Sequence, residues 1–175
     1  MGIEEKINGA KTVYKGIFLN VERLSVTLPN GEKGERDVIR HPGAVAILAV
    51  NKNGDILIEK QYRAALNKVI LEIPAGKLDP GEDPMNAAIR ELKEETGYSA
   101  GSIKKLGDIA LAAGYSDEII SIYLAQDLVA GSNNLDIDEF LEIDFYPKKK
   151  ILEQIKNGEI IDSKTICAMT YLELE

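Results

Sequence analysis

Polar and apolar residues alternate along the first forty residues in the pattern of β-strands. Residues 13–28 (VYKGIFLNVERLSVTL) are rich in β-branched and aromatic side chains, and the turn at Pro29–Gly31 separates them from a returning strand at residues 35–40 (ERDVIR). Residues 43–50 (GAVAILAV) then form a continuous apolar run, which is typical of a strand buried on both faces. This part of the chain therefore predicts a strand ribbon followed by a core strand.

The pattern of the remaining chain predicts further strands and three helices. The expected strands are residues 56–63, 68–76, 103–112, 118–128 and 140–146. The expected helices are residues 84–96, a helix that begins at Pro147 and ends at Gly158, and residues 163–174. Strands packed between helices indicate an α/β or α+β layered domain, with the N-terminal ribbon as a small separate sheet.

The first of these helices has clear ends and two distinct faces. Asp83 is a good N-cap, Pro84 a good first helical residue and Gly97 a good stop. At about 100° per residue, the mainly apolar positions fall on one arc and three carboxylates on another. The apolar arc holds Met85, Ile89, Leu92 and Thr96, and the acidic arc holds Glu91, Glu94 and Glu95. We expect the apolar arc to face the core and the acidic arc to turn away from it.

The acidic arc needs an explanation, because like charges at neighbouring helical positions repel one another. A solvated surface face is one explanation, and a bound cation is the other. The preceding loop at residues 73–82 (IPAGKLDPGE) favours a cation, because its glycines let backbone approach a ligand and the Ala75–Gly76 turn offers carbonyl oxygens. Ala87 and Ala88 lie near the acidic arc and leave room for an approaching group. Such a site favours metal-assisted hydrolysis of an anionic substrate such as a diphosphate.

The composition of the chain limits which metal ions and which partners we expect it to bind. One cysteine and one histidine exclude the usual zinc sites, so the metal is expected to be Mg²⁺, Mn²⁺ or Ca²⁺, held by oxygen. A net charge of −8 argues against binding to nucleic acid or to an anionic membrane. No apolar run is long enough for a transmembrane helix, and the N-terminus lacks the apolar stretch of a secretory signal. With a single cysteine, these features predict a cytoplasmic protein.

Residues 76–98 carry a spacing that resembles a known family. The fixed positions are Gly76, Glu82, Arg90-Glu91-Leu92, Glu94-Glu95 and Gly97-Tyr98. They are similar to the Nudix box, and every fixed position of that box is present. The segments HPGAVAILAV, EKQYR, LEIPAGKL, GYSDE and DEFLEI follow in the order found in the ADP-ribose pyrophosphatase branch. The similarity extends over roughly residues 12–174.

This resemblance implies a fold and an activity. The fold is an α/β class structure, a Nudix-type α/β/α sandwich at residues 42–175, with a small antiparallel strand domain at residues 1–41 that is exchanged across a homodimer. The activity is hydrolysis of a nucleoside diphosphate sugar, namely ADP-ribose to AMP and ribose 5-phosphate, with Mg²⁺ or, as a substitute, Mn²⁺. The alternatives are another ADP-sugar, a GDP-sugar, FAD or a dinucleoside polyphosphate as substrate. A non-catalytic nucleotide-sugar sensor is a further alternative, but such proteins usually lose box glutamates.

The resemblance also implies roles for the box residues. Glu91 and Glu95 would be the main metal ligands, together with the carbonyl of Ala75. Glu94 would bind the metal or orient a water molecule bound to it. Arg90 would hold the glutamates by ion pairing without touching the substrate.

Outside the helix, the resemblance implies four substrate-site residues. Arg63 would reach the phosphates or the terminal ribose, and Arg36 would do so from the N-terminal sheet of the partner subunit. Glu72 and Gly76, at the loop before the helix, complete this set, with Glu72 also a candidate for the metal site.

The general base is expected in the loop before residues 140–146. Glu139 matches best, and Asp138 and Glu142 are the competing candidates. One departure concerns the substrate. Ala113–Gly114 stands where this branch usually has Pro-Gly, and this keeps the alternative substrates open.

Overall fold

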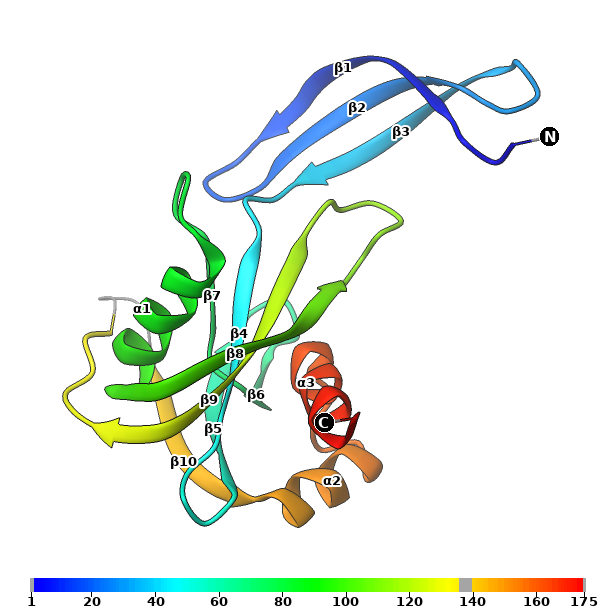
Figure 1. Ribbon diagram of the computed structural model, residues 1–175. Coiled ribbons are helices and arrows are strands. Elements are labelled where there is room, and N and C mark those ends of the chain that lie inside the picture. The colour runs from blue at the N-terminus through cyan, green and yellow to red at the C-terminus, as the bar shows by residue number, and fades with distance from the viewer. Residues whose placement is uncertain (1, 136–139, 175) are drawn as a thin grey trace. The chain divides into compact units, whose positions relative to one another are not determined.

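The computed structural model describes residues 2–135 and 140–174, which form two compact units (Figure 1). The N-terminal unit contains the described residues up to Gly43 and the loop Ala110–Ile119. The main unit contains the described residues of Ala44–Ile109 and Ile120–Glu175. Within the described part of the chain, no helix is both long and apolar enough to cross a lipid bilayer.

The N-terminal unit is antiparallel as predicted, but it has three strands in the order β1-β2-β3, because the run at residues 13–28 is divided between β1 and β2. These are β1 (Lys6–Lys15), β2 (Asn20–Thr27) and β3 (Lys33–Arg40). The loop Ala110–Ile119 is fastened to β3, because the N–H of Ile39 donates to the Tyr115 carbonyl at 2.7 Å. The carboxylate of Asp117 accepts from Arg40 Nη1 at 2.9 Å and from the His41 N–H at 2.8 Å.

The main unit contains two sheets. The four-stranded sheet has the order β7-β4-β9-β8, with β4 (Ala44–Ala49), β7 (Ala75–Lys77), β8 (Tyr98–Ala110) and β9 (Ile119–Ala130). The three-stranded antiparallel sheet has the order β10-β5-β6, with β5 (Asp55–Arg63), β6 (Lys68–Glu72) and β10 (Leu141–Pro147). The helices are α1 (Pro84–Thr96), α2 (Lys148–Lys156) and α3 (Ser163–Leu174).

Strand β4 is buried on both faces, as its continuous apolar run predicts. Its alternate residues join two separate apolar clusters. Ala44, Ala46 and Leu48 pack with Ile151 of α2 and with Ala168 and Met169 of α3. Val45, Ile47 and Ala49 pack with Ala87, Ala88 and Leu92 of α1. Helices therefore cover both faces of this sheet (Figure 1), and the predicted α/β/α sandwich is confirmed.

The strand predicted at residues 68–76, which was expected to end in a turn containing proline and glycine, is confirmed only as far as Glu72, because the chain then changes sheets. Strand β6 ends at Glu72, and β7 pairs with β4 in the other sheet. At the crossing, the N–H of Ile73 donates to Thr165 Oγ1 at 2.9 Å, and the carbonyl of Pro74 accepts from the Ile47 N–H at 2.8 Å. Pro74 has no N–H to continue the first ladder. The crossing brings Glu72 and Ala75 to the junction of the two sheets.

The ends of α1 lie at the expected capping residues, whereas the start of α2 differs from the prediction. Asp83 Oδ1 accepts from the N–H groups of Met85 at 3.0 Å and Asn86 at 3.2 Å, and Gly97 ends α1 with φ 75°. Helix α2 begins at Lys148 rather than at Pro147, because Pro147 is extended (ψ 134°) and is the last residue of β10.

The expected orientation of α1 is wrong in part, because Leu92 and Thr96 are buried as expected but the other two residues of the apolar arc are not. Met85 and Ile89, placed on the core face by their hydrophobicity, are 41% and 49% exposed. The small side chains of Ala87 and Ala88 are fully buried instead, so they bring the helix close to β4 and leave no room for a ligand between them. The acidic side consequently turns toward the sheet, and Glu95 is only 4% exposed.

Candidate active site

Arg90 lies at the centre of the box and binds the carboxylates of three glutamates. Its Nε and Nη2 donate to the two carboxylate oxygens of Glu82 at 2.9 and 2.8 Å. Its Nη1 donates to Glu91 Oε1 at 2.8 Å and to Glu94 Oε2 at 3.0 Å. Nη2 also donates to the carbonyl of Lys77 at 3.2 Å, so one guanidinium links the helix, the preceding loop and β7.

These contacts shift the pKa of both partners in the charged direction. The hydrogen bonds from Arg90, with a further one from the N–H of Asp79, lower the pKa of Glu82 to about 2. Hydrogen bonds to Glu82 raise the pKa of Arg90 despite its partial burial, and Glu91 and Glu94 add to this effect. The positive charge of Arg90 therefore offsets part of the repulsion between the neighbouring glutamates.

Gly76 forms a cradle for the carboxylate of Glu91. Gly76 lies on β7 opposite Val45 of β4. A Cβ atom at position 76 would lie 1.9 Å from Glu91 Cδ and 2.0 Å from its Oε1. Only glycine therefore lets the Glu91 carboxylate lie against the strand backbone.

Glu95 is fixed by the neighbouring residue of the same strand. The N–H of Ala75 donates to Glu95 Oε2 at 3.0 Å. This bond supports a carboxylate that is almost fully buried. Glu94, one residue earlier, keeps a side chain that is 42% exposed. The three carboxylates of the acidic arc thus differ in access to solvent, with Glu94 the most open to a ligand.

The donors of this site fit a hard divalent cation by their chemistry. Carboxylates on adjacent turns of one helix are ligands that such cations prefer. Among the residues described, no three acidic, histidine or cysteine side chains are gathered into a ready-made metal site. The carboxylates of Glu91, Glu94 and Glu95 accept hydrogen bonds from Arg90 and from the Ala75 N–H instead.

Arg63 and Glu72 form a second pair of predicted site residues at the sheet junction. Arg63 Nε and Nη2 donate to the two oxygens of Glu72, each at 2.8 Å. The Glu72 side chain is 1% exposed and that of Arg63 42%. Burial works to lower the pKa of Arg63, but Glu72, Asp162 and Glu95 together outweigh it and raise this pKa. The charge of Glu95 thus acts on Arg63, which connects this pair to the box.

Lys164 belongs to the same cluster and was missed by sequence reasoning. Its Nζ binds Glu72 and also donates to Asp162 Oδ1 at 3.0 Å. Asp162 Oδ2 accepts from the N–H and the Oγ1 of Thr165 at 2.9 and 2.6 Å, which caps α3. The Asp162–Thr165 spacing could have predicted this cap. No local signal could have paired Lys164 with Glu72, because 92 residues separate them.

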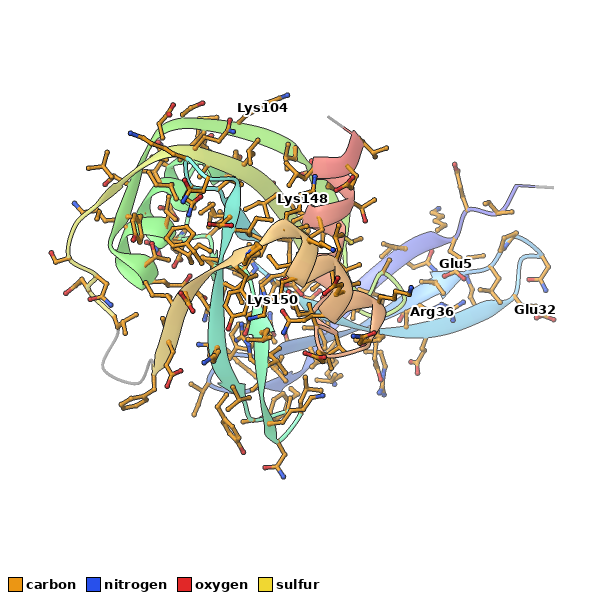
Figure 2. The ribbon with its side chains drawn as sticks, turned by 90° about the horizontal axis from the view of Figure 1, so that it is seen from below. Glu5, Glu32, Arg36, Lys104, Lys148 and Lys150 are labelled. Carbon is orange, nitrogen blue, oxygen red and sulfur yellow. The ribbon has the colours of Figure 1, made fainter. Side chains whose placement is uncertain are left out.

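The remaining predicted residues lie elsewhere or outside the described chain. Arg36 is on β3 of the N-terminal unit, where it binds Glu5 and donates to the Glu35 carbonyl at 2.8 Å (Figure 2). Glu142 has a 78% exposed side chain and accepts from Lys60 Nζ at 3.0 Å. The other two candidates for the general base, Asp138 and Glu139, lie outside the described residues.

The loop before those two residues starts against the box helix. The N–H of Asn134 donates to the carbonyl of Glu94 at 2.9 Å. A Cβ at Gly97 would lie 2.7 Å from the Asn133 nitrogen and 3.0 Å from the Gly131 carbonyl oxygen, so backbone passes closely over the helix end. The absence of a side chain at Gly97 permits this approach.

Comparison with known proteins connects this arrangement to a family. The chain is 42% identical over 174 residues to the methanol dehydrogenase activator of Bacillus methanolicus, covering 98% of this chain and 94% of that protein. It is 39% identical over 175 residues to the ADP-ribose pyrophosphatase of Bacillus subtilis (strain 168), covering 99% and 95%. A crystal structure of an ADP compounds hydrolase superposes with a TM-score of 0.86 at 24% identity, covering 98% of this chain and 93% of that one, and so shares its fold.

The family profile described as the NUDIX domain matches residues 40–169, which is well over half of the chain. This range includes the Arg90 cluster, the Gly76 cradle and the Arg63–Glu72 pair. The chain therefore belongs to the NUDIX family.

Proposed function

We propose that this NUDIX pyrophosphohydrolase cleaves ADP-ribose to AMP and ribose 5-phosphate, by in-line attack of water on one phosphorus of the diphosphate. The observation that carries this proposal is the glutamate cluster around Arg90, with Glu91 in the Gly76 cradle and Glu95 on the Ala75 N–H. The B. subtilis relative, aligned over nearly the whole chain, is an ADP-ribose pyrophosphatase and supports this substrate.

Mg²⁺ is the cation that we propose for this site, with Mn²⁺ as a substitute. Glu91, Glu94, Glu95 and the carbonyl of Ala75 would hold it. Such an ion would polarise phosphoryl oxygens and lower the pKa of a bound water. Arg90 would keep the glutamates charged and aligned, because it already holds Glu91 and Glu94 at hydrogen-bonding distance.

The diphosphate would be bound by arginines outside the box. Arg63 suits this role because its side chain is 42% exposed at the sheet junction, while its Nε and Nη2 are held by Glu72. We assign the general base to Glu139, with Asp138 and Glu142 as competitors. This assignment rests on the resemblance of the segment DEFLEI to the ADP-ribose pyrophosphatase branch.

A homodimer forms part of the same proposal, with Arg36 of the N-terminal unit reaching the partner's substrate. Large apolar side chains that would be covered by a partner gather on the N-terminal unit. They include Ile7 (60% exposed), Tyr14 (57%), Ile17 (111%) and Phe18 (53%). A three-stranded ribbon with such exposed apolar groups is marginal by itself and needs a surface to pack against. The single cysteine supports a reducing location such as the cytoplasm.

A panel of substrates tests this function directly. The purified protein is assayed with Mg²⁺ on ADP-ribose, another ADP-sugar, a GDP-sugar, FAD and a dinucleoside polyphosphate, and the products are identified. Release of AMP and ribose 5-phosphate, with the highest kcat/KM for ADP-ribose, supports the proposal. A higher kcat/KM for another substrate would reassign the specificity, which Ala113 in place of the usual proline leaves open. Binding without turnover of any substrate would favour the sensor alternative.

A second candidate function is activation of a dehydrogenase. The relative from B. methanolicus is a methanol dehydrogenase activator and is 42% identical to this chain. Adding the purified chain to a methanol dehydrogenase, with and without the Glu95→Gln substitution, tests this function. A rise in dehydrogenase rate that is lost with the substitution would show that activation uses the hydrolytic site.

A further inference from the structure

Lys164 occupies a position that is unfavourable for a cation. Its side chain is 8% exposed, and burial of a charge costs free energy unless the charge is paired. It also lies in the first turn of α3 (Ser163–Leu174), where the helix dipole places partial positive charge. Glu72 and Asp162, whose side chains are 1% and 12% exposed, offset these costs.

The arrangement gives Glu72 two cationic partners that approach from different elements. Lys164 Nζ reaches Glu72 Oε2 from α3, and the same oxygen accepts from Arg63 Nη2 of β5. Glu72 Oε1 accepts from Arg63 Nε. The Glu72 carboxylate is therefore fixed by Lys164 on one side, and it orients the guanidinium of Arg63 on the other.

The guanidinium that is held in this way retains a nitrogen for another partner. Nε and Nη2 bind Glu72, so Nη1 of Arg63 is not committed to that carboxylate. The Arg63 side chain is 42% exposed, whereas Lys164 is too deeply buried to meet a substrate itself. A fixed guanidinium loses less conformational freedom when it binds a phosphate than a mobile one does.

We propose that Lys164 is a positioning residue that locks Glu72 and thereby aims Arg63 at the diphosphate of the substrate. This proposal rests on the proposed function, in which Arg63 binds the diphosphate. The competing explanation is structural, because the neighbouring bond from the Ile73 N–H to Thr165 Oγ1 already joins α3 to the strand crossing. In that explanation Lys164 would only strengthen the connection between α3 and the strand crossing.

The test is a double-mutant cycle on Lys164 and Arg63, read by steady-state kinetics with ADP-ribose and Mg²⁺. Lys164→Met should raise KM about tenfold and change kcat little, because Arg63 contributes binding that ground state and transition state share. In the Arg63→Gln background, Lys164→Met should raise KM no further. The matched control is Lys148→Met, which removes a lysine whose pair with Glu173 is exposed and should leave KM unchanged.

Several outcomes would overturn the proposal. KM effects that multiply in the double variant would show that Lys164 does not act through Arg63, and an unchanged KM in Lys164→Met would show that it does not act on the substrate site. Lys164→Gln, which keeps a hydrogen-bond donor, is the substitute if Lys164→Met does not fold. Its KM should still rise, because glutamine lacks the charge and the length of the lysine that pairs with Glu72, and the same cycle applies to it.

A measurement without substrate separates this proposal from the proposed function. Hydrogen exchange of the Arg63 Nε–H, followed by NMR, should be faster in Lys164→Met than in the wild-type protein and unchanged in Lys148→Met. If the wild-type protein hydrolyses no member of the substrate panel, the proposed function is wrong. In that case the exchange rate of the Arg63 Nε–H alone tests whether Lys164 positions Arg63. Unchanged exchange in Lys164→Met would then overturn it.

Discussion

The N–H of Ala75 donates a hydrogen bond to the carboxylate of Glu95 across 3.0 Å, and this bond joins strand β7 to the last turn of α1. It explains how a helix can turn its acidic side toward a sheet. A buried carboxylate is tolerated when backbone donors satisfy it. The same bond places Glu95 beside the carbonyl that would complete a cation site.

Replacement of Glu95 should separate catalysis from folding. In Glu95→Gln the amide oxygen can still accept from Ala75, so the free energy of unfolding should change little. Loss of one charged ligand should lower kcat by about 100-fold or more. The measurements are kcat at saturating Mg²⁺ and urea unfolding of the same preparation. Near-normal turnover in the folded variant would contradict the proposed metal site.

Gly76→Ala should affect activity more than stability. The new Cβ would overlap the Glu91 carboxylate, which lies at the end of a flexible side chain and can move away. We expect a cost of about 1–3 kcal/mol in unfolding free energy, together with loss of most activity because Glu91 leaves its place. Gly9→Ala is the control, since a Cβ at Gly9 meets nothing within 4 Å. Equal activity in the two variants would show that the cradle has no role in catalysis.

Glu82 should contribute to stability in a defined range of acid pH. Its pKa in the folded protein is about 2, against an ordinary value of 4.5, because Arg90 binds the charged form. A lowered folded-state pKa means that the stabilisation is fully present above about pH 4.5 and is lost as the pH falls toward 2. In Glu82→Gln, the free energy of unfolding should therefore fall less between these two pH values. Parallel pH profiles for the two proteins would contradict this pairing.

Sequence reasoning succeeded where the signal was local. The caps at Asp83 and Gly97 and the apolar run of β4 depend on neighbouring residues, and the structure confirms them. The face of α1 could not be predicted from hydrophobicity alone. Ala87 and Ala88 allow a closer approach to the sheet than Met85 and Ile89 would, so packing distance outweighed side-chain hydrophobicity.

The same contrast holds for the candidate site. Contacts between residues close in the sequence were predicted, and contacts between residues far apart in the sequence were not. The resemblance to the Nudix box implied that Arg90 would pair with the glutamates, and Arg90 contacts three of them in the structure. The contact of Lys164 with Glu72 depends on how α3 returns to the end of β6, and no local pattern encodes it. Nor did the strand pattern reveal the change of sheet at Pro74, because apolar residues continue through it.

The proposed homodimer should be visible in solution. The protein should sediment as a dimer at micromolar concentration, since the N-terminal unit exposes apolar side chains such as Tyr14 and Phe18. Substituting both by Ser should shift the protein toward monomer and lower activity if the partner completes the site. A fully active monomer at the same concentration would contradict the dimer.

Glu139→Gln should lower kcat far more than it raises KM. A general base acts in the chemical step and contributes typically about 10²–10⁴-fold, whereas ground-state binding stays largely intact when it is lost. The comparison is kcat for Asp138→Asn, Glu139→Gln and Glu142→Gln with one substrate. Glu142→Gln is expected to be the mildest, because that side chain is 78% exposed and paired with Lys60. A large loss of kcat in Asp138→Asn or Glu142→Gln, with Glu139→Gln still active, would move the base to that residue. Full activity of all three would assign water activation to the box glutamates and their cation.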